Sequence, residues 1–418
     1  MSSRGTVRVP GDKSISHRAL ILGALASGES RIRGILQSAD IHSTAAVLRA
    51  LGSPVPDLSA SFKLSGKGLR GLSQPGSPLD AGNSGTTVRL MSGVVAAHDF
   101  TSRFEGDASL SRRPMKRIAE PLTAMGARFE FAQSDGLPMT IHGGRLSGIA
   151  WNTRSASGQT KSAILLAGLV AGVQVSVRES QKSRDHTERM LTSMGAPVEA
   201  DDLTVSLSPV ESLAPLDITI PGDPSSAAYL IALGVLRTSG EIVLPDICIN
   251  RTRTGFMQRL MAMGGDVSCD DKFAIAGDTV ATVFARPSTL HDSSVGKDEV
   301  PSMIDELPLL GCVAAAAGIG LEVTGASELR VKESDRISNL VSNLNTIGGR
   351  AEELPDGFRI MRGARSFSGR VKTEGDHRIA MAFGVLGALR GNTVEIDDPD
   401  CVAVSYPGFW SDLALLAR

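Results

Sequence analysis

Cysteine, aromatic residues and long uncharged apolar runs are all scarce in this sequence. The four cysteines among 418 residues are widely spaced, with no Cys-x-x-Cys pair and no histidine at metal-ligand spacing. This spacing argues against a zinc site, a redox pair and a disulfide framework. We therefore expect no metal, and buried free thiols at Cys248, Cys269, Cys312 and Cys401.

Neither sign of charge is in excess. The 43 Lys and Arg residues stand against 45 Asp and Glu residues, a formal net charge of −2, so we expect neither nucleic acid nor a membrane as partner. The opening stretch lacks an apolar core of signal-peptide length, and no later segment runs about 18 residues without charge or strong polarity. These features favour a cytoplasmic protein that binds anions, if at all, through local clusters.

The length of 418 residues, with 42% hydrophobic content, exceeds what one ordinary core requires. It predicts two domains of about 200 residues each. Aromatics make up only 4% while 45 residues are glycine, so tight turns and aliphatic packing should dominate the fold.

A repeat of roughly 70 residues runs through the chain. Five segments end in a Leu-x-x-hydrophobic-Gly phrase whose apolar spacing is typical of an amphipathic helix closed by glycine at a left-handed position. After most of them a short alternating stretch, such as residues 127–131, is typical of a half-buried strand. The five phrases end at Gly52, Gly126, Gly195, Gly264 and Gly348.

A second repeated phrase is a small polar turn that runs into a long apolar helix. Six copies fit six βαβαββ-like units, with a break between domains near Pro221 and Gly222. Because helix N-termini present unpaired N–H groups, such turns favour phosphates and carboxylates. The apolar helices are expected at residues 19–26, 88–97, 162–170, 227–236, 307–317 and 379–389.

The first of these turns has the residue types of an anion-binding site. Lys13 and Ser14 lie at the expected helix start, and Arg18 follows Ser14 by four residues, on the same face. A capped helix with solvated basic residues is the alternative.

Two further turns carry candidate contacts. Gly85, in a loop without the Lys-Ser/Thr ending of a nucleotide P-loop, would let a ligand approach the backbone, although a simple tight turn fits equally well. Arg112 and Arg113 precede a proline that suits a first helical turn. Their planar guanidinium groups suit carboxylate or phosphate, and a solvated turn is the alternative.

The stretch from Glu328 to Arg336 is the most informative. If it is helical, Lys332 and Arg336 lie four residues apart, and like charges at that spacing repel unless something anionic sits between them. Glu333 and Asp305 supply carboxylates for proton transfer. A surface helix of mixed charge remains the alternative.

A Ser-His-Asp hydrolase is not indicated. Asp376 and His377 are neighbours in sequence, which rarely satisfy triad geometry, and no Gly-x-Ser-x-Gly elbow is present. His186 is expected to be a hydrogen-bonding structural histidine.

Taken together, the phrases PGDKSISHRA, GNSGTT, GDASLSRRPM, SGQTKSA, LRVKESDR and GDHRIAM closely resemble the 5-enolpyruvylshikimate-3-phosphate (EPSP) synthases, from Pro10 to Pro407. The resemblance implies an α/β fold, a two-domain inside-out α/β barrel. Each domain would hold three βαβαββ repeats around buried parallel helices. It also implies domains at residues 12–221 and at 1–11 plus 222–418, with the active site in the cleft between them.

The reaction implied by the resemblance is transfer of the enolpyruvyl group of phosphoenolpyruvate to the 5-hydroxyl of shikimate 3-phosphate, without metal or organic cofactor. In that chemistry the hydroxyl attacks C2 while C3 is protonated, and phosphate then leaves as C3 loses a proton. The implied protein is a monomer whose catalytic groups are Lys13, Asp305 and Glu333.

The substrate contacts are likewise carried over by motif position. The set that resembles shikimate 3-phosphate contacts is Lys13, Ser14, Arg18, Ser157, Gln159, Arg184, Asp305 and Lys332. The set that resembles phosphoenolpyruvate contacts is Lys13, Asn83, Gly85, Arg113, Gln159, Arg336 and Arg378.

The chain departs from the family pattern at a few places. Val404 stands where many members carry a lysine that touches phosphoenolpyruvate, Gly158 where a second serine is common, and Arg184 near where some members use tyrosine. Gly85 predicts sensitivity to glyphosate, because members with alanine there tolerate this inhibitor.

Two rivals stay open. UDP-N-acetylglucosamine enolpyruvyltransferases usually carry a reactive cysteine in the loop before their Arg-Pro pair, and residues 104–114 contain none. A ligand-binding relative without catalysis is the second rival, and the presence together of Lys13, Asp305 and Glu333 argues against it.

Overall fold

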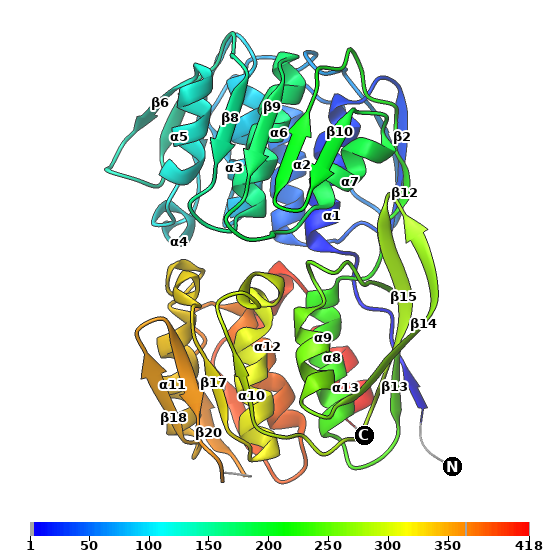
Figure 1. Cartoon of the computed structure of the whole chain (residues 1–418), viewed down its shortest axis with the longest axis vertical. Coiled ribbons are helices and arrows are strands. Elements are labelled where there is room, and N and C mark those ends of the chain that lie inside the picture. The colour runs from blue at the N-terminus through cyan, green and yellow to red at the C-terminus, as the bar shows by residue number, and fades with distance from the viewer. Residues whose placement is uncertain (1–3, 364–365, 418) are drawn as a thin grey trace. The chain divides into compact units, whose positions relative to one another are not determined.

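The computed structural model describes residues 4–363 and 366–417, which form a mixed α/β structure of two compact units (Figure 1). Unit 1 contains the described residues of 1–10, 221–273 and 279–418, and unit 2 contains residues 11–220 and 274–278. The chain passes between units at Pro10–Gly11 and at Ile220–Pro221. The hairpin tip at 274–278 also belongs to unit 2, which the sequence did not indicate.

The βαβαββ order is complete in repeats two, three and five. In each, the first two strands pair in parallel and the final hairpin adds two antiparallel strands. Repeat two consists of β4(Leu79–Asp80), α3(Gly85–Ala96), β5(Thr101–Glu105), α4(Ala108–Ser111), α5(Lys116–Met125), β6(Arg128–Phe131) and β7(Met139–His142). Repeat three consists of β8(Ile149–Asn152), α6(Gly158–Ala171), β9(Val175–Arg178), α7(His186–Ser193), β10(Val198–Asp201) and β11(Thr204–Leu207). Repeat five consists of β16(Ser293–Val295), η1(Val300–Ser302), η2(Ile304–Glu306), α10(Leu307–Ala317), β17(Leu321–Val323), η3(Ser327–Val331), α11(Arg336–Thr346), β18(Ala351–Leu354) and β19(Gly357–Ile360).

Repeats one and four exchange their first strands. β1(Arg4–Thr6) pairs in parallel with β13 of repeat four, and β12(Asp217–Thr219) pairs in parallel with β2 of repeat one. Residues 4–10 therefore belong to unit 1 although repeat one belongs to unit 2. Repeat one continues with α1(Lys13–Leu25), β2(Glu29–Arg33), α2(Ala39–Ala50) and β3(Ser61–Ser65). Repeat four continues with α8(Pro224–Leu236), β13(Glu241–Cys248), α9(Gly255–Ala262), β14(Asp266–Ile275) and β15(Asp278–Arg286).

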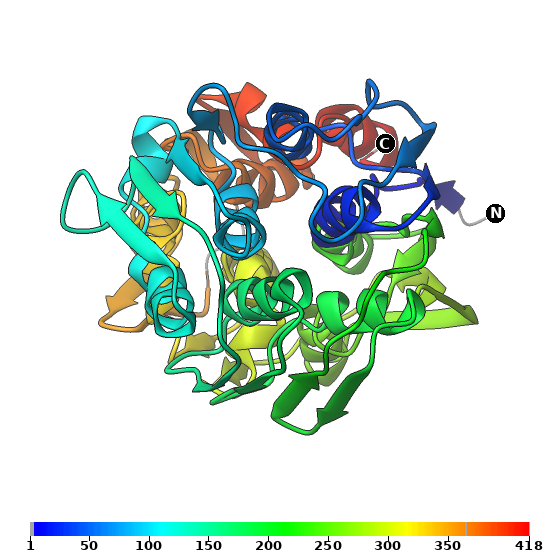
Figure 2. The ribbon, with the colours of Figure 1, turned by 90° about the horizontal axis from the view of Figure 1, so that it is seen from above.

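Repeat six is shortened at its end. β20(Ser368–Val371), α12(His377–Ala388) and β21(Thr393–Ile396) form its βαβ part, and η4(Pro399–Val404) and α13(Phe409–Leu416) follow in place of a hairpin. Each unit thus holds three separate sheets, and none closes into a barrel within the described residues. Seen from above in Figure 2, the helices of unit 2 lie end-on with their strands outside them.

The expected apolar helices are α1, α3 and α6 in unit 2 and α8, α10 and α12 in unit 1, and they are buried on nearly every side. Within each unit these helices contact one another. Because small polar caps satisfy the N–H groups of their first turns, these helices can begin in buried surroundings. The side chains that cap five of them are Asp12, Ser84, Ser157, Asp223 and Asp376.

The predicted glycine stops are confirmed. The helices α2, α5, α7, α9 and α11 end just before the five glycines named above, whose φ angles lie between 82° and 122°. In that region a side chain would be strained, so glycine ends the helix without cost. The strand expected at 127–131 is β6.

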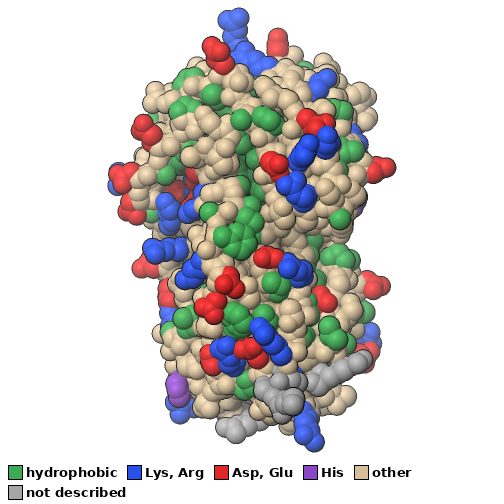
Figure 3. Space-filling model, turned by 90° about the vertical axis from the view of Figure 1, so that its right-hand side faces the viewer, with side chains coloured by type: hydrophobic (Ala, Val, Ile, Leu, Met, Phe, Trp, Pro, Cys, Tyr) green, Lys and Arg blue, Asp and Glu red, His purple; other side chains and the backbone are tan. Residues whose placement is uncertain are grey.

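The cysteine prediction is only partly right. All four thiols are free, but Cys248 and Cys312 are buried while Cys269 and Cys401 are partly exposed. Among the described residues, every helix is too short or too polar to cross a membrane. On the face drawn in Figure 3, basic and acidic side chains are interspersed, in keeping with the small net charge.

Candidate active site

The first turn of α1 holds a rigid group of donors. Asp12 accepts from the N–H of Ile15 at 2.8 Å and so caps the helix. Arg18, only 4% exposed, donates through Nη1 to the Ser14 carbonyl at 2.9 Å, which fixes its guanidinium against the turn. Arg184 Nη1 lies 3.5 Å from Ser14 Oγ. The structure therefore brings Ser14, Arg18 and Arg184 together, as the sequence predicts.

Two hydroxyls complete the surroundings of Arg18. Its Nε donates to Thr187 Oγ1 at 2.6 Å and its Nη2 to Ser162 Oγ at 2.9 Å. Thr187 belongs to α7 and Ser162 to α6, so one guanidinium joins three helices of unit 2.

Lys13 is oriented by a carboxylate that the sequence did not single out. Its ammonium forms an ion pair with Asp40 of α2. The Lys13 side chain is 18% exposed and that of Asp40 is 8% exposed. The ammonium is thus held in one direction while part of the side chain still reaches solvent.

The first turn of α3 gathers a second group. Asn83 donates to Asp107 Oδ2 at 2.5 Å and accepts from Arg113 Nη2 at 2.7 Å. Arg113 is buried, whereas Arg112 is exposed. Pro114 lies before α5, which begins at Lys116, so its expected place in a first helical turn is wrong.

Gly85 begins α3 beside two arginines. A Cβ on Gly85 would lie 2.9 Å from Arg89 Nη1 and 3.5 Å from Arg113 Nη1. A side chain at Gly85 would therefore crowd the Arg89 guanidinium and contact that of Arg113. Arg89 was not predicted as a site residue, although a buried arginine one turn into a helix that begins at a glycine was a usable signal.

Arg89 also joins α3 to α6. Its Nη1 donates to Gln159 Oε1 at 2.9 Å, and Gln159 Nε2 donates to Thr86 Oγ1 at 3.0 Å. Ser157, which caps α6, accepts from the N–H of Thr160 at 3.3 Å. The predicted pair Ser157 and Gln159 thus lies at the start of α6, linked to the start of α3.

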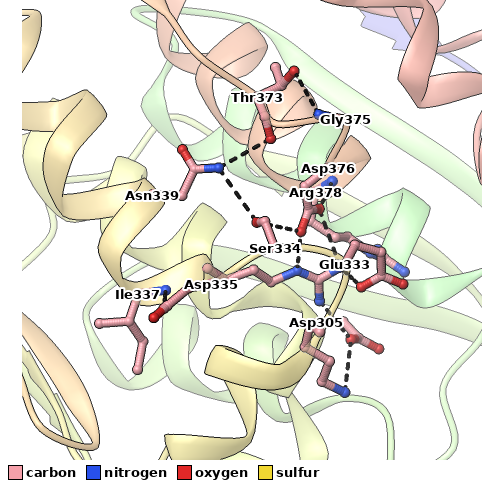
Figure 4. Close-up of polar contacts among 12 residues, drawn as sticks. Asp305, Glu333, Ser334, Asp335, Ile337, Asn339, Thr373, Gly375, Asp376 and Arg378 are labelled. Atoms are coloured by element: carbon pink, nitrogen blue, oxygen red, sulfur yellow. Dashed lines mark hydrogen bonds and ion pairs between the residues drawn. The ribbon is translucent and has the colours of Figure 1, made fainter. Parts of the chain in front are cut away.

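In unit 1 the predicted residues surround Arg336, whose side chain is 1% exposed (Figure 4). Arg336 Nη2 donates to Glu333 Oε2 at 2.7 Å and Nη1 to Asp305 Oδ1 at 3.3 Å. Its Nε donates to Asp376 Oδ2 at 2.8 Å. Burial acts to lower the pKa of Arg336, but the negative charges of the three carboxylates outweigh it and raise that pKa.

Lys332 approaches the same cluster from the end of η3. The stretch from Glu328 to Arg336 is not one helix, because η3 ends at Val331 and α11 begins at Arg336. Lys332 Nζ nevertheless lies 3.9 Å from Asp305 Oδ1, so the anion expected between the two cations is Asp305 in this structure. Burial lowers the pKa of Lys332, although the charge of Asp305 acts in the opposite direction.

Arg378 lies in the first turn of α12. Its N–H donates to Asp376 Oδ1 at 2.9 Å, and the residue is 7% exposed. Burial acts to lower the pKa of Arg378, yet nearby Tyr229 and Asp305 raise it overall. Asp376, which was dismissed as a triad member, therefore orients Arg336 and caps the helix that carries Arg378.

Other expectations resolve as follows. His186 Nδ1 lies 2.8 Å from Asp278 Oδ2 with both residues buried, which confirms a structural histidine. Val404 is the last residue of η4 and is partly buried. Within the described ranges, no three His, Cys, Asp or Glu residues are grouped as metal ligands would be.

Each unit therefore presents fixed cations at or near helix starts. Lys13, Arg18 and Arg113 of unit 2 and Lys332, Arg336 and Arg378 of unit 1 suit phosphate and carboxylate groups. Unit 1 adds Asp305 and Glu333, two carboxylates on one guanidinium, which suit proton transfer.

Known proteins resemble the chain over its full length. The family model of EPSP synthase (3-phosphoshikimate 1-carboxyvinyltransferase) matches residues 2–413. A 3-phosphoshikimate 1-carboxyvinyltransferase of Sulfurihydrogenibium sp. (strain YO3AOP1) is 45% identical, covering 99% of this chain and 97% of that protein. A 3-phosphoshikimate 1-carboxyvinyltransferase of Aquifex aeolicus (strain VF5) is 45% identical, covering 98% of this chain and 96% of that protein.

Solved structures agree. The EPSP synthase from Acinetobacter baumannii superposes with a TM-score of 0.87 and 38% identity, covering 100% of this chain and 96% of that one. The fold, the helix-start cations and these matches lead to one conclusion. The chain belongs to the EPSP synthase family, the 3-phosphoshikimate 1-carboxyvinyltransferases.

Proposed function

We propose that this chain transfers the enolpyruvyl group of phosphoenolpyruvate to the 5-hydroxyl of shikimate 3-phosphate, releasing phosphate and 5-enolpyruvylshikimate 3-phosphate. The observation that carries the proposal is the position of Asp305 and Glu333 on the buried guanidinium of Arg336, in a chain that matches the family from residue 2 to 413. Two carboxylates held by one fixed cation supply the acid-base groups that an addition followed by an elimination requires.

Shikimate 3-phosphate is assigned to the donors at the starts of α1 and α6 and to two groups of unit 1. The Ser14 hydroxyl and the Arg184 guanidinium already lie together, so a phosphate there would meet oriented donors. Arg18 donates once from each guanidinium nitrogen within the protein, which holds its positive charge in place beside this turn. The full set is Lys13, Ser14, Arg18, Ser157, Gln159, Arg184, Asp305 and Lys332.

Phosphoenolpyruvate is assigned to the start of α3 and to the arginines of unit 1. Gly85 lies beside Arg89 and Arg113, whose forks suit a phosphate or carboxylate. Arg89 is an addition to the set that the sequence predicts. That set is Lys13, Asn83, Gly85, Arg113, Gln159, Arg336 and Arg378.

The chemical steps assign one proton to each acid-base group. Asp305 accepts the proton of the 5-hydroxyl as the hydroxyl oxygen bonds to C2 of phosphoenolpyruvate, while Glu333, protonated at this stage, gives its proton to C3. The tetrahedral adduct then loses phosphate from C2 as C3 returns a proton to Glu333. Lys13, which is oriented by Asp40, assists as an acid near the phosphate. Fixed cations lower the barrier because they stabilise the charge that develops on the phosphate, without reorganising.

Two finer expectations remain predictions. If the protein is a monomer, light scattering after size-exclusion chromatography should give the mass of one chain. A cytoplasmic location predicts recovery in the soluble fraction after cell lysis.

The test is phosphate release by the purified protein with phosphoenolpyruvate plus either shikimate 3-phosphate or UDP-N-acetylglucosamine, repeated with chelator. We expect release with the shikimate ester alone, unchanged by chelator. Asp305→Asn and Glu333→Gln should each lower kcat by about 10²- to 10⁴-fold, and Asp292→Asn on the surface of unit 1 should not. Release only with the sugar nucleotide would assign the chain to the rival reaction, and binding without release would support the non-catalytic rival.

A further inference from the structure

A chain of buried hydrogen bonds runs across unit 2 beneath the predicted substrate-binding turns. His17 Nδ1 lies 2.7 Å from Thr44 Oγ1, and Thr44 Oγ1 lies 2.6 Å from Thr87 Oγ1. Thr87 Oγ1 donates to Ser84 Oγ at 2.7 Å. All four residues are 0% exposed. The chain thus joins α1, α2 and the cap of α3 where no solvent reaches.

Each end of this chain lies one helical turn or less from a predicted substrate contact. His17 follows Lys13 by four residues on α1, and Ser84 directly precedes Gly85. Thr44 follows Asp40, the partner of Lys13, by four residues on α2. The Lys13–Asp40 pair and the His17–Thr44 bond are therefore two successive ties between α1 and α2, and the second continues to α3 through Thr87.

The protons in the chain have one consistent order. Because the Thr87 hydroxyl donates to Ser84, its oxygen accepts from Thr44, whose single proton goes to Thr87 at 2.6 Å rather than to the Asp40 carbonyl at 3.5 Å. Thr44 must therefore accept from His17, which places the imidazole proton on Nδ1 and leaves Nε2 bare. His17 Nε2 indeed has no hydrogen-bond partner among the described residues.

The surroundings of His17 favour the neutral form that this order requires. Burial lowers the pKa of His17 well below its usual value, and the positive charges of Lys13 and Arg18 act in the same direction. A second proton on Nε2 would be buried without an acceptor, at the cost of an unmade hydrogen bond. A neutral imidazole also adds no charge next to the cations that grip the substrates.

We propose that His17 is a positioning residue that ties the first turn of α1 to the first turn of α3 and so fixes the spacing of the anion-binding groups in those turns. The inference rests on the proposed function in one respect, namely that the two turns bind the two substrates. Without the tie, the position of Lys13 and Ser14 relative to Gly85 and Arg113 would be less firmly fixed, although the helices still pack together. The substrates would then have to order the two turns on binding, and catalytic efficiency would fall.

Matched variants test this role. His17→Leu removes the polar link at similar bulk, and His17→Asn offers an amide N–H near the place of Nδ1. We expect His17→Leu to lower kcat/KM for both substrates roughly 5- to 10-fold, the effect of one lost hydrogen bond, with His17→Asn recovering most of the loss. Thr44→Val should have a similar effect, and the double variant His17→Leu/Thr44→Val should be no worse than either single variant.

His98 supplies the control. It is also buried, with Nδ1 bonded to the Val94 carbonyl at 2.9 Å and Nε2 without a partner in the described structure. It lies at the far end of α3 from Gly85. His98→Leu should therefore lower the stability of unit 2 while leaving kcat/KM of the folded enzyme unchanged. An effect of His17→Leu that matches the control, or no rescue by asparagine, would overturn the proposal.

The tautomer gives a readout that does not depend on turnover. In protein with ¹⁵N-labelled histidine, the His17 signals can be identified by their loss in His17→Asn, and we expect a protonated Nδ1 and a bare Nε2 at neutral pH. A protonated Nε2 would overturn the proposal even if the enzyme is fully active. If the wild-type protein releases no phosphate from the proposed substrate pair, the proposed function fails, and the nitrogen signals still decide the hydrogen-bond order.

Discussion

Arg336 and Asp376 form an ion pair that is closed to solvent, with Nε 2.8 Å from Oδ2 and side chains 1% and 0% exposed. Asp376 also receives the N–H of Arg378 and the hydroxyl of Ser334. One carboxylate therefore orients the Arg336 guanidinium and caps the helix that carries Arg378, two residues assigned to phosphoenolpyruvate. The buried guanidinium of Arg336 can bind an anion in a defined position only while Asp376 holds it in place.

Asp376→Asn should accordingly destabilise unit 1 and weaken phosphoenolpyruvate binding. Loss of one partner of a buried pair costs about 3 kcal/mol or somewhat more. Urea unfolding can be followed for this unit alone in a Trp151→Phe background, because Trp410 is then the only tryptophan. KM for phosphoenolpyruvate should rise more than KM for shikimate 3-phosphate.

The control for this prediction is the Asp292–Arg362 pair on the surface of unit 1, whose side chains are 43% and 73% exposed. Asp292→Asn should change the unfolding free energy much less than Asp376→Asn, because solvent screens an exposed ion pair. Equal effects of the two substitutions would mean that Asp376 does not hold Arg336 as described.

Gly85→Ala should discriminate between phosphoenolpyruvate and glyphosate. The added methyl would lie 2.9 Å from Arg89 Nη1, so the end of a flexible side chain must shift at the proposed phosphoenolpyruvate contacts. We expect the inhibition constant of glyphosate to rise at least about tenfold, with a smaller rise in KM for phosphoenolpyruvate.

The matched control is Gly144→Ala, because a Cβ at Gly144 meets no atom within 4 Å. This variant should leave both constants unchanged. Equal inhibition constants for the parent and Gly85→Ala would remove Gly85 as the determinant of sensitivity.

The lowered pKa of Lys332 predicts that shikimate 3-phosphate binding depends on pH. Burial lowers the pKa of Lys332 from its ordinary value of 10.5, so its ammonium loses its proton at a lower pH than an exposed lysine. KM for shikimate 3-phosphate should therefore rise as pH increases through the alkaline range below 10.5. Lys332→Arg keeps the positive charge over this whole range and should flatten the rise, at the cost of a poorer fit. An identical pH profile in Lys332→Arg would assign the titration to another group.

Much of the fold could be predicted because its signals are local. The glycine stops at Gly52 and Gly126 end their helices through backbone conformation alone, and the apolar helices follow from hydrophobic periodicity. The exchange of β1 and β12 between repeats could not be read this way. Strand pairing joins Arg4 to Glu241, and nothing in either short strand specifies so distant a partner.

In the candidate site, too, residues with a local sequence signal could be predicted, whereas partners brought together by packing could not. Charged residues within a motif, such as Lys13 and Arg336, were found because their type and spacing suggest anion binding. Their partners Asp40 and Asp376 were missed because each lies on another helix, and only the packing of helices brings the charges together. Lys332 lies in an irregular stretch between η3 and α11, so its approach to Asp305 does not follow from the helical spacing considered for Glu328 to Arg336.

The two buried histidines of unit 2 predict a loss of stability in mild acid. Burial lowers the pKa of both His17 and His98, so each is neutral in the native state while the unfolded chain takes up a proton below about pH 6.5. The unfolded state then binds more protons, and the unfolding free energy falls as pH decreases from 6.5 until the lowered native pKa values are reached, by up to about 1.4 kcal/mol per pH unit for each proton. With Trp151 as the only tryptophan in a Trp410→Phe background, the slope of unit 2 can be measured by urea unfolding. His17→Asn and His98→Asn should each reduce the slope below pH 6.5 and leave it unchanged above that value. If the slope persists in the double variant, the acid sensitivity belongs to other groups and both histidines are charged in the folded protein.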